Sequence, residues 1–457
     1  MTTPAINFAR MSAAAIPGPR RRYPGEFALA IVRRPLEFLS GLAVEFGDVA
    51  TFNIGRQPIV LLSHPDDIRD VLVTHGRRFH KGRGLERARV LLGNGLLTSE
   101  DEVHLRQRRL VQPAFHRARI AGYGDTMADY ARQRADAWTD GAEFDVAHEM
   151  AAYTLSVVGK TLFDADIEGE AHDIGEALAT AIATFNVTVL PGSEFLLRLP
   201  IPVAIRFRRA RARLDATIYE MIARRRASGE DRGDLLSMLL LAHDTEGDGS
   251  GMSDVQLRDE AMTLLLAGHE TTANALMWAW YLLAGAPEVE ARFHAEIDAL
   301  GDRALGADDL ARLPYTRAVL AETMRLYPPA WILGRRALDA YHVRGHEIAP
   351  RTVVLMSQWI VHRDPRWWER ATTFQPERWL PDGSACDVAR PKFSYFPFGA
   401  GTRICVGEQF AWMEGLLALA TFARRWRLRL APGHQVEPQP IVTLRAKHGM
   451  RMIAERR

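Results

Sequence analysis

The chain has 457 residues, with 58 Lys and Arg against 56 Asp and Glu, so its formal net charge is only +2. A charge so close to zero gives no field that would draw the protein to nucleic acid or to a membrane surface, and we expect neither as a partner. The two cysteines, Cys386 and Cys405, are too few for a disulfide scaffold and favour a reducing cytoplasm. No segment reaches the roughly 18 consecutive apolar residues of a membrane span, so we expect a soluble protein without a membrane anchor.

Residues 1–22 include a Pro-Gly-Pro sequence and match no regular element, so they predict an extended or disordered lead-in. Residues 23–457 show mainly helical periodicity, without an internal repeat or a low-complexity linker, and predict a single domain. The strand-like runs are short and few, and include 49–54, 59–62 and 352–356. The fold class that we expect is mainly α with small β-sheets.

Two loops interrupt the helical sequence in the middle of the chain. Pro191–Pro202 contains three prolines in an apolar context, which is typical of a loop that covers a pocket. Asp244–Gly251 is rich in Gly and Asp and leads to Ser253 and Gln256, which have the spacing of a capping box. We therefore expect a long helix to begin there.

This long helix is expected to run to about residue 283. Its centre, residues 264–272, reads L-L-L-A-G-H-E-T-T and places polar groups where an apolar run should have continued. Ala267 and Thr271 share one face of the helix, and the hydroxyl of Thr271 can bond back to the carbonyl four residues earlier. Gly268 adds room for the helix to lie close over a cofactor.

Cys405 lies in the sequence F-G-A-G-T-R-I-C-V-G, residues 398–407, directly before an amphipathic helix. Backbone amides and the helix dipole converge on such a position, so we expect a lowered thiol pKa and the thiolate that a metal requires. Gly401 and Gly407 permit a tight turn and the close approach of a large planar ligand, and Arg403 could meet an anionic group of that ligand. Cys386, in a polar stretch rich in turn residues, is assigned no role.

The cysteine loop fits the pattern F-x-x-G-x-R-x-C-x-G at Phe398, Gly401, Arg403, Cys405 and Gly407. This pattern resembles the haem-binding loop of the cytochrome P-450 superfamily, and the resemblance extends from about residue 47 to the carboxyl end. It implies the cytochrome P-450 fold, with heme b (iron protoporphyrin IX) between the long central helix and the cysteine-loop helix. By resemblance Cys405 is the iron ligand, and Phe398, Arg403 and Gly407 lie at the cofactor.

Two further segments resemble the same family. Residues 267–272 are similar to its oxygen-activation segment, which implies that Ala267, Gly268 and Thr271 lie against the haem. By resemblance, Thr271 would hydrogen-bond the oxygen species at the iron and Glu270 would relay protons from solvent. Glu322, Arg325 and Arg378 resemble the family's buried ion network behind the haem, which we interpret as structural.

Haem propionates need cationic or hydrogen-bonding partners when they are partly buried. The resemblance assigns this role to His104, Arg108, Arg335 and Arg403. The position of His104 is often tryptophan in the family, which leaves its contact open. Arg336 is the alternative to Arg335.

The resemblance implies a haem-thiolate monooxygenase that inserts one oxygen atom from O2 into a hydrophobic small molecule, by hydroxylation or epoxidation. No dinucleotide fingerprint or flavin-type domain follows Cys405, so electrons from NAD(P)H would arrive through a reductase and a ferredoxin or flavodoxin. The basic residues that could receive such a partner are Arg106, Arg108, Arg109 and Lys392. Solvated arginines are an equally good interpretation, and the denser run Arg206–Arg213 favours a solvated helix face. We expect a monomer.

The expected pocket walls are largely apolar and comprise 85–97, 185–199, Ala267, 330–333 and 441–443. They predict a hydrophobic substrate such as a fatty acid, terpenoid, steroid or polyketide, without selecting among these classes. Two alternatives remain at this stage. One is a non-catalytic haem-binding sensor or carrier, in which Glu270 and Thr271 would be needless, and the other is a haem-free helical binding protein.

Overall fold

The computed structural model describes residues 15–164, 175, 177, 178, 180, 181, 199–244, 249–381 and 390–457. Its α-helices are α1 (Glu26–Arg33), α2 (Pro35–Phe46), α3 (Pro65–Arg69), α4 (Arg83–Leu92), α5 (Asp101–Val111), α6 (Arg117–Ala121), α7 (Gly124–Ala137), α8 (Val146–Phe163), α11 (Pro202–Ser228), α12 (Leu235–Leu241), α13 (Asp254–Ala284), α14 (Pro287–Asp298), α15 (Pro314–Leu326), α16 (Gln358–Val361) and α18 (Glu408–Ala423). Its strands are β1 (Val49–Ile54), β2 (Gln57–Leu62), β3 (Phe79–Lys81), β4 (Glu143–Asp145), β5 (Leu333–Ala337), β6 (Tyr341–Val343), β7 (His346–Ile348), β8 (Val353–Met356), β9 (Trp426–Leu430), β10 (Pro438–Pro440), β11 (Leu444–Ala446) and β12 (Arg451–Arg456).

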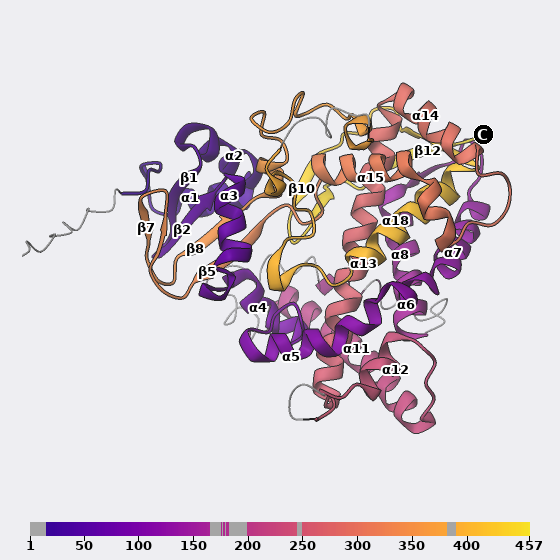
Figure 1. Cartoon of the computed structure of the whole chain (residues 1–457), viewed down its shortest axis with the longest axis horizontal. Coiled ribbons are helices and arrows are strands. Elements are labelled where there is room, and N and C mark those ends of the chain that lie inside the picture. Colours follow the sequence, from indigo (N-terminus) through magenta and orange to yellow (C-terminus); the bar gives the residue numbers. More distant parts are fainter. Residues whose placement is uncertain are drawn as a thin grey trace, which may run out of the picture.

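Helices make up most of the molecule, and the largest sheet lies at one end of it, at the left of Figure 1. This sheet has the strand order β1-β2-β8-β5-β3, with β2 and β8 parallel and the other neighbours antiparallel. A second sheet has the order β4-β12-β9. The predicted class, mainly α with small β-sheets, is confirmed, as are the three predicted strand runs, which appear as β1, β2 and β8.

Helix α13 passes through the middle of the molecule (Figure 1). It begins with the predicted capping box, in which the Ser253 amide donates to Gln256 Oε1 at 2.9 Å and the Gln256 amide donates to Ser253 Oγ at 3.3 Å. It ends at Ala284, within one residue of the predicted end. Because helices pack around most of its circumference, α13 is buried along most of its length and forms the centre of the core.

The described part of the lead-in lies against β1. The carbonyl of Pro17 accepts a hydrogen bond from the Thr51 amide at 2.8 Å. A Cβ added at Gly18 would lie only 1.9 Å from the Thr51 carbonyl oxygen, so the close approach of the two backbones requires glycine there. Residues 1–14 and most of the predicted loop Pro191–Pro202 lie outside the described residues. Among the described helices, none combines the length and the apolar character needed to cross a membrane.

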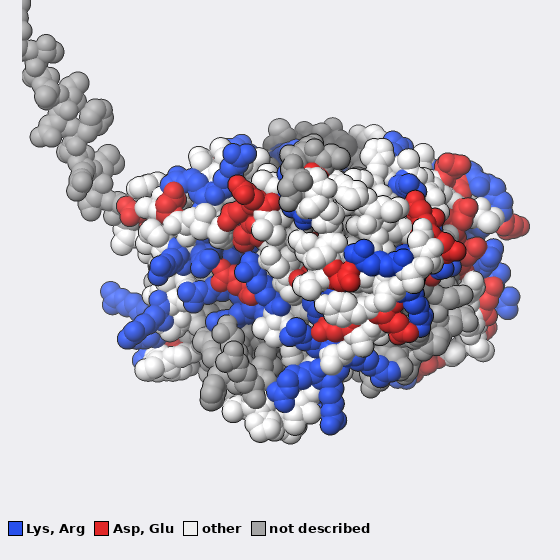
Figure 2. Space-filling view, turned by 90° about the horizontal axis from the view of Figure 1, so that it is seen from below, with Lys and Arg blue, Asp and Glu red and all other residues white. Residues whose placement is uncertain are grey.

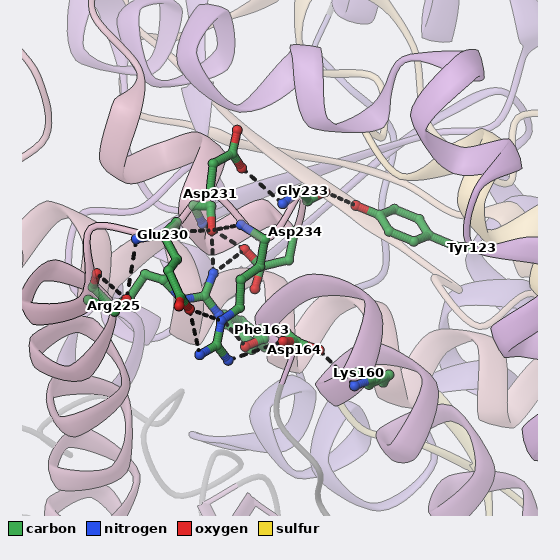
Figure 3. A network of polar contacts seen from close by, with 12 residues as sticks. Tyr123, Lys160, Phe163, Asp164, Arg225, Glu230, Asp231, Gly233 and Asp234 are labelled. Atoms are coloured by element: carbon green, nitrogen blue, oxygen red, sulfur yellow. Dashed lines mark hydrogen bonds and ion pairs between the residues drawn. The ribbon is translucent and has the colours of Figure 1, made fainter.

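A buried polar network ties together the ends of α8, α11 and α12 (Figure 3). Arg225, near the end of α11, donates to Asp234 Oδ1 at 2.6 Å and to the Phe163 carbonyl at 3.3 Å. Asp234 also caps α12 by accepting a hydrogen bond from the Ser237 amide at 2.8 Å. Because the guanidinium is buried, it needs these acceptors, and they fix α11 against the end of α8, the helix that packs along α13.

Candidate active site

The cysteine loop forms a short 3₁₀ turn, Gly401–Arg403, and then enters α18. The Cys405 amide donates to the Phe398 carbonyl at 3.0 Å, which closes the loop on itself. Gly401 has φ +71°, and a Cβ added there would lie 2.1 Å from the Leu72 carbonyl oxygen. The predicted tight turn is therefore confirmed, and the close approach that needs glycine at this position is to the backbone of Leu72.

Other predicted residues flank the sulfur. A Cβ added at Gly407 would lie 3.7 Å from Phe115 Cε1 and 4.0 Å from Cys405 Sγ, so a side chain there would fill space beside the thiol. Arg108 Nη1 donates to the Ile404 carbonyl at 2.7 Å, which fixes the backbone immediately before the cysteine. Among the described contacts, Arg108 is thus a partner of the cysteine loop.

The predicted lowering of the Cys405 pKa is wrong. Burial raises the pKa of the thiol to about 11, although a hydrogen bond from the Gly407 backbone acts in the opposite direction. This backbone hydrogen bond does not compensate for the loss of solvation around the sulfur. Cys405 as a residue nevertheless keeps exposed surface, which leaves space for a ligand beside the loop. A metal that binds this sulfur must itself displace the proton.

A cluster of buried cations lies beside the cysteine loop. The antiparallel pairing of β3 and β5 places Lys81 directly opposite Arg335. Lys81 is 4% exposed, and its Nζ donates to the Leu96 and Ser99 carbonyls at 2.8 and 2.7 Å. Burial lowers the pKa of Lys81 to about 7, and burial together with the nearby Arg403 lowers the pKa of Arg335 to about 10.

His104 and Arg403 complete this cluster. The pKa of His104 falls to about 4, first because of burial and then because of Lys81 and Arg403. Its Nε2 is buried and makes no close hydrogen bond in the described part of the chain, although the backbone of Thr402 is near enough to act on the pKa in the opposite direction. Arg403 donates to the Phe79 carbonyl at 3.1 Å and pairs with Glu100.

The structure thus brings together three of the predicted propionate partners, His104, Arg335 and Arg403. It adds Lys81, which sequence reasoning missed because only the pairing of β3 with β5 brings this lysine to the site. The alternative residue, Arg336, points elsewhere and forms an ion pair with Glu86 at 2.7 Å.

The middle of α13 carries the second group of predicted residues. Ala267 is exposed and Thr271 is half-buried, whereas most of the helix on either side of them is buried, so open space lies beside this stretch. Thr271 Oγ1 donates to the Ala267 carbonyl at 2.7 Å, as predicted. At Gly268 an added Cβ would lie 3.1 Å from Val158 Cγ2 of α8. The absence of a side chain at Gly268 therefore allows α13 to pack closely on α8. The expectation that Gly268 makes room for a cofactor is not supported by this contact.

Glu270 contacts the β10–β11 hairpin through Thr443 and Arg445. Its carboxylate accepts hydrogen bonds from the Thr443 hydroxyl and from Arg445, with which it forms an ion pair. The Asn274 side chain in turn donates to Thr443 Oγ1 at 3.1 Å. The pairing with Arg445 joins segments 175 residues apart, so the spacing of motifs could not indicate it.

The predicted ion network of Glu322, Arg325 and Arg378 is confirmed as a buried structural feature. Glu322 is 0% exposed and accepts two hydrogen bonds of 2.8 Å from Arg325 and one of 3.0 Å from Arg378 Nε. Trp379 Nε1 also donates to Glu322, at 2.9 Å. Each buried charge therefore has a partner of opposite sign.

The donor set fits an anionic planar group bound beside the cysteine. Lys81, Arg335 and Arg403 form a cluster of cations in which Glu100 is an immediate anionic partner. Neighbouring cations lower one another's pKa, so an additional anion would stabilise their charged forms. The unpartnered Nε2 of His104 offers a further polar contact. The exposed surfaces of Cys405 and Ala267 leave room for the group, so these residues fit a haem.

Comparison with known proteins agrees with this geometry. Residues 19–450 match the family model described as Cytochrome P450. The chain is 43% identical to cyclooctatin synthase of Streptomyces melanosporofaciens, over 94% of this chain and 93% of that protein. It is 40% identical to cyclooctat-9-en-7-ol 5-monooxygenase of the same organism, over 89% and 87% of the two chains. The structure superposes on the retinoic acid-bound cyanobacterial CYP120A1 with a TM-score of 0.88, 25% identity, and 98% and 100% coverage.

The fold and the cysteine-loop sequence define a haem-thiolate protein, and the match over residues 19–450 shows that the chain belongs to the cytochrome P450 family. It is a cytochrome P450 monooxygenase, which hydroxylates a hydrophobic small molecule with O2 and takes electrons from a redox partner. Membership in this family excludes the haem-free binding protein, and the monooxygenase assignment replaces the sensor or carrier.

Proposed function

We propose that the chain binds heme b through Cys405 Sγ, with Lys81, His104, Arg335 and Arg403 as partners of the propionates. The observation that carries this proposal is the group of cations Lys81, Arg335 and Arg403, two of them buried, next to a loop whose cysteine keeps exposed surface, with Glu100 and Glu260 as the anions that act on Lys81. Carboxylates of a bound haem would offset that charge and restore the proton affinity of Lys81. Once bound, a haem with a thiolate ligand supplies the electron density that favours O-O cleavage.

We propose Thr271 and Glu270 as the residues that manage protons beside the haem. Thr271 Oγ1 can release its bond to the Ala267 carbonyl and turn to the open side of α13 without breaking the backbone ladder of the helix. Glu270 forms an ion pair with Arg445, whose side chain is 27% exposed and thus reaches solvent. To relay a proton, the Glu270 carboxylate would take one up from solvent on the Arg445 side, swing away from Arg445, and pass it to Thr271 Oγ1 as that hydroxyl gives up its own proton.

We propose a terpenoid-like hydrocarbon or alcohol as the substrate class. Two similar proteins carry names that refer to cyclooctatin and cyclooctat-9-en-7-ol, and the solved structure reported above holds retinoic acid. The expected pocket walls agree with an apolar substrate, although most of 185–199 lies outside the described residues. Trp331, expected in these walls, lies in the core and donates from its indole nitrogen to the Ile441 carbonyl at 3.2 Å. The neighbouring Ile332 is therefore the better position for altering the regioselectivity of oxidation.

The electron donor that we propose is a ferredoxin or flavodoxin, reduced by NAD(P)H through a reductase. Arg108 and Lys392 are its candidate contacts on the cysteine side. Arg106 and Arg109 both pair with the nearly buried Asp244, at 3.5 and 2.9 Å, so they are already engaged within the chain. Figure 2, which views the molecule from below, shows several groups of Lys and Arg side chains with acidic side chains between them. The exposed arginines of the run Arg206–Arg213 in α11 agree with a solvated helix face.

We further propose that residues 23–457 form a single haem domain, that residues 1–22 are a lead-in to it, and that the protein acts as a cytoplasmic monomer. The match to the family model begins at residue 19, within four residues of this boundary. The sparse use of cysteine supports a reducing compartment. Size-exclusion chromatography with light scattering tests the monomer.

The ligand assignment is tested by comparing Cys405→Ser with Cys386→Ser. We expect Cys405→Ser to lose the thiolate-type carbon monoxide difference spectrum and Cys386→Ser to keep it. Lys81→Met should retain haem about tenfold less tightly than the matched Arg336→Met, because only the first removes a cation from the cluster. An unchanged spectrum in Cys405→Ser would refute the ligand. The substrate class is tested by titrating terpenoids, fatty acids and steroids and following the absorption shift of the ferric haem.

A further inference from the structure

The segment that leads into the cysteine loop is held from behind by a buried histidine. The backbone amide of Phe396 donates to His362 Nε2 at 3.0 Å. His362 follows α16, is 0% exposed, and lies against the rings of Tyr395 and Phe396, with centroids 5.0 and 5.2 Å from its own. The hydrogen bond therefore joins the imidazole to the backbone two residues before Phe398.

The same histidine is attached to the buried ion network. Arg325 Nη1 donates to the His362 carbonyl at 2.7 Å, and the same guanidinium binds Glu322 with two hydrogen bonds of 2.8 Å. Beyond His362 the chain of contacts continues towards the sulfur. The Gly399 amide donates to the Phe396 carbonyl at 3.0 Å, and the Cys405 amide donates to the Phe398 carbonyl at 3.0 Å.

We propose that His362, as the neutral imidazole with an unprotonated Nε2, is the positioning residue that couples the Glu322–Arg325–Arg378 network to the cysteine loop. The inference rests on the proposed role of Cys405 as the iron ligand. His362 itself touches neither the sulfur nor a substrate, and it acts through the backbone between Phe396 and Cys405.

The chemistry of the site requires this protonation state. An amide N-H can only donate, so Nε2 must accept, and a neutral imidazole then carries its proton on Nδ1. Burial lowers the pKa of His362 well below its usual value, and the neighbouring cations Arg325 and Arg363 act in the same direction. A second proton on the ring would replace the acceptor with a donor facing the Phe396 amide.

Other contacts hold the segment as a whole, but they leave the Phe396 amide to His362. Trp368 Nε1 donates to the Ser394 carbonyl at 3.3 Å, and the Tyr395 hydroxyl donates to the Ala321 carbonyl of α15 at 3.1 Å. Both contacts lie before Phe396. Loss of the histidine acceptor should therefore loosen the part of the loop nearest the cysteine while its anchor to α15 persists.

The test compares His362→Phe, which keeps a ring without the acceptor, with His362→Gln, which keeps a polar acceptor of similar reach. His294→Phe is the matched control, because His294 is also buried but lies in α14, away from the cysteine loop. Each haem-loaded variant is measured for amide hydrogen exchange at Phe396 and for the share of its carbon monoxide complex that retains the thiolate-type spectrum. We expect about tenfold faster exchange and a reduced thiolate share in His362→Phe, with both largely restored in His362→Gln.

Parent-like exchange and spectrum in His362→Phe would overturn the inference, and so would equal losses in His294→Phe. If His362→Phe does not fold, the parent protein decides the question. With nitrogen-15 labelled histidine in the diamagnetic ferrous carbon monoxide complex, Nε2 of His362 must be the unprotonated nitrogen, and a protonated Nε2 would contradict the proposal. A parent without a thiolate-type spectrum would instead refute the proposed ligand, so the two failures are distinguishable.

Discussion

Glu322 offers the sharpest test of the energetics of this fold. It is 0% exposed and accepts hydrogen bonds from Arg325, Arg378 and Trp379, and its Oε1 also accepts one from the Gln375 amide at 3.1 Å. The change Glu322→Ala would leave two buried guanidinium groups without their counter-charge. Breaking a buried pair by removing one partner costs about 3–5 kcal/mol, since the remaining charge keeps its desolvation penalty.

The expected consequence is a large loss of stability. For a large domain, about 4 kcal/mol corresponds to a fall of about 8 °C in the melting temperature. Glu322→Gln keeps the shape and one strong acceptor and should lose roughly half as much. Thermal unfolding followed by circular dichroism measures both variants with and without haem.

The matched control is Glu143, whose carboxylate pairs with Arg451 at 2.7 Å on the surface, with side chains 43% and 51% exposed. Glu143→Ala should cost less than about 1 kcal/mol, because solvent screens this pair. If Glu322→Ala proved no more destabilising than Glu143→Ala, the assigned importance of burial in this network would be wrong.

Three further predictions follow from individual residues. Gly401→Ala should sharply lower the yield of haem-loaded protein, because residue 401 has φ +71° and the added Cβ would lie 2.1 Å from the Leu72 carbonyl oxygen. Gly433 has φ +77° but nothing within 4 Å of an added Cβ, so Gly433→Ala measures the cost of the backbone angle alone. Burial raises the pKa of Glu260 from 4.5 to about 7. Between these pH values the folded state binds more protons than the unfolded state, so the stability of the folded state falls as the pH rises. Glu260→Gln should flatten this pH dependence of stability in urea titrations at pH 4.5, 6 and 7. Thr271→Ala should lower the amount of product formed per NAD(P)H consumed by about tenfold or more, whereas Thr271→Ser and the neighbouring Thr272→Ala should not. An equal ratio of product to NAD(P)H in all three variants would exclude a role for the Thr271 hydroxyl.

The sequence by itself determined the features that depend on neighbours along the chain. The capping box of Ser253 and Gln256 fixed the start of α13, because its groups are three residues apart. The turn of the cysteine loop followed from Gly401, and the bond of Thr271 to the Ala267 carbonyl followed from helical spacing. The charge pair Glu322–Arg325 could be recognised in the same way, because residues three apart on a helix are adjacent.

Only the tertiary structure decided the features that depend on segments distant in sequence and on burial. Strand pairing places Lys81 opposite Arg335, and the packing of α13 on the β10–β11 turn gives Glu270 its partner Arg445. The thiol of Cys405 shows why local reasoning falls short. The backbone hydrogen bond from Gly407 is local and can be expected from the chain, but desolvation depends on every segment packed around the sulfur. Here desolvation has the larger effect on the pKa.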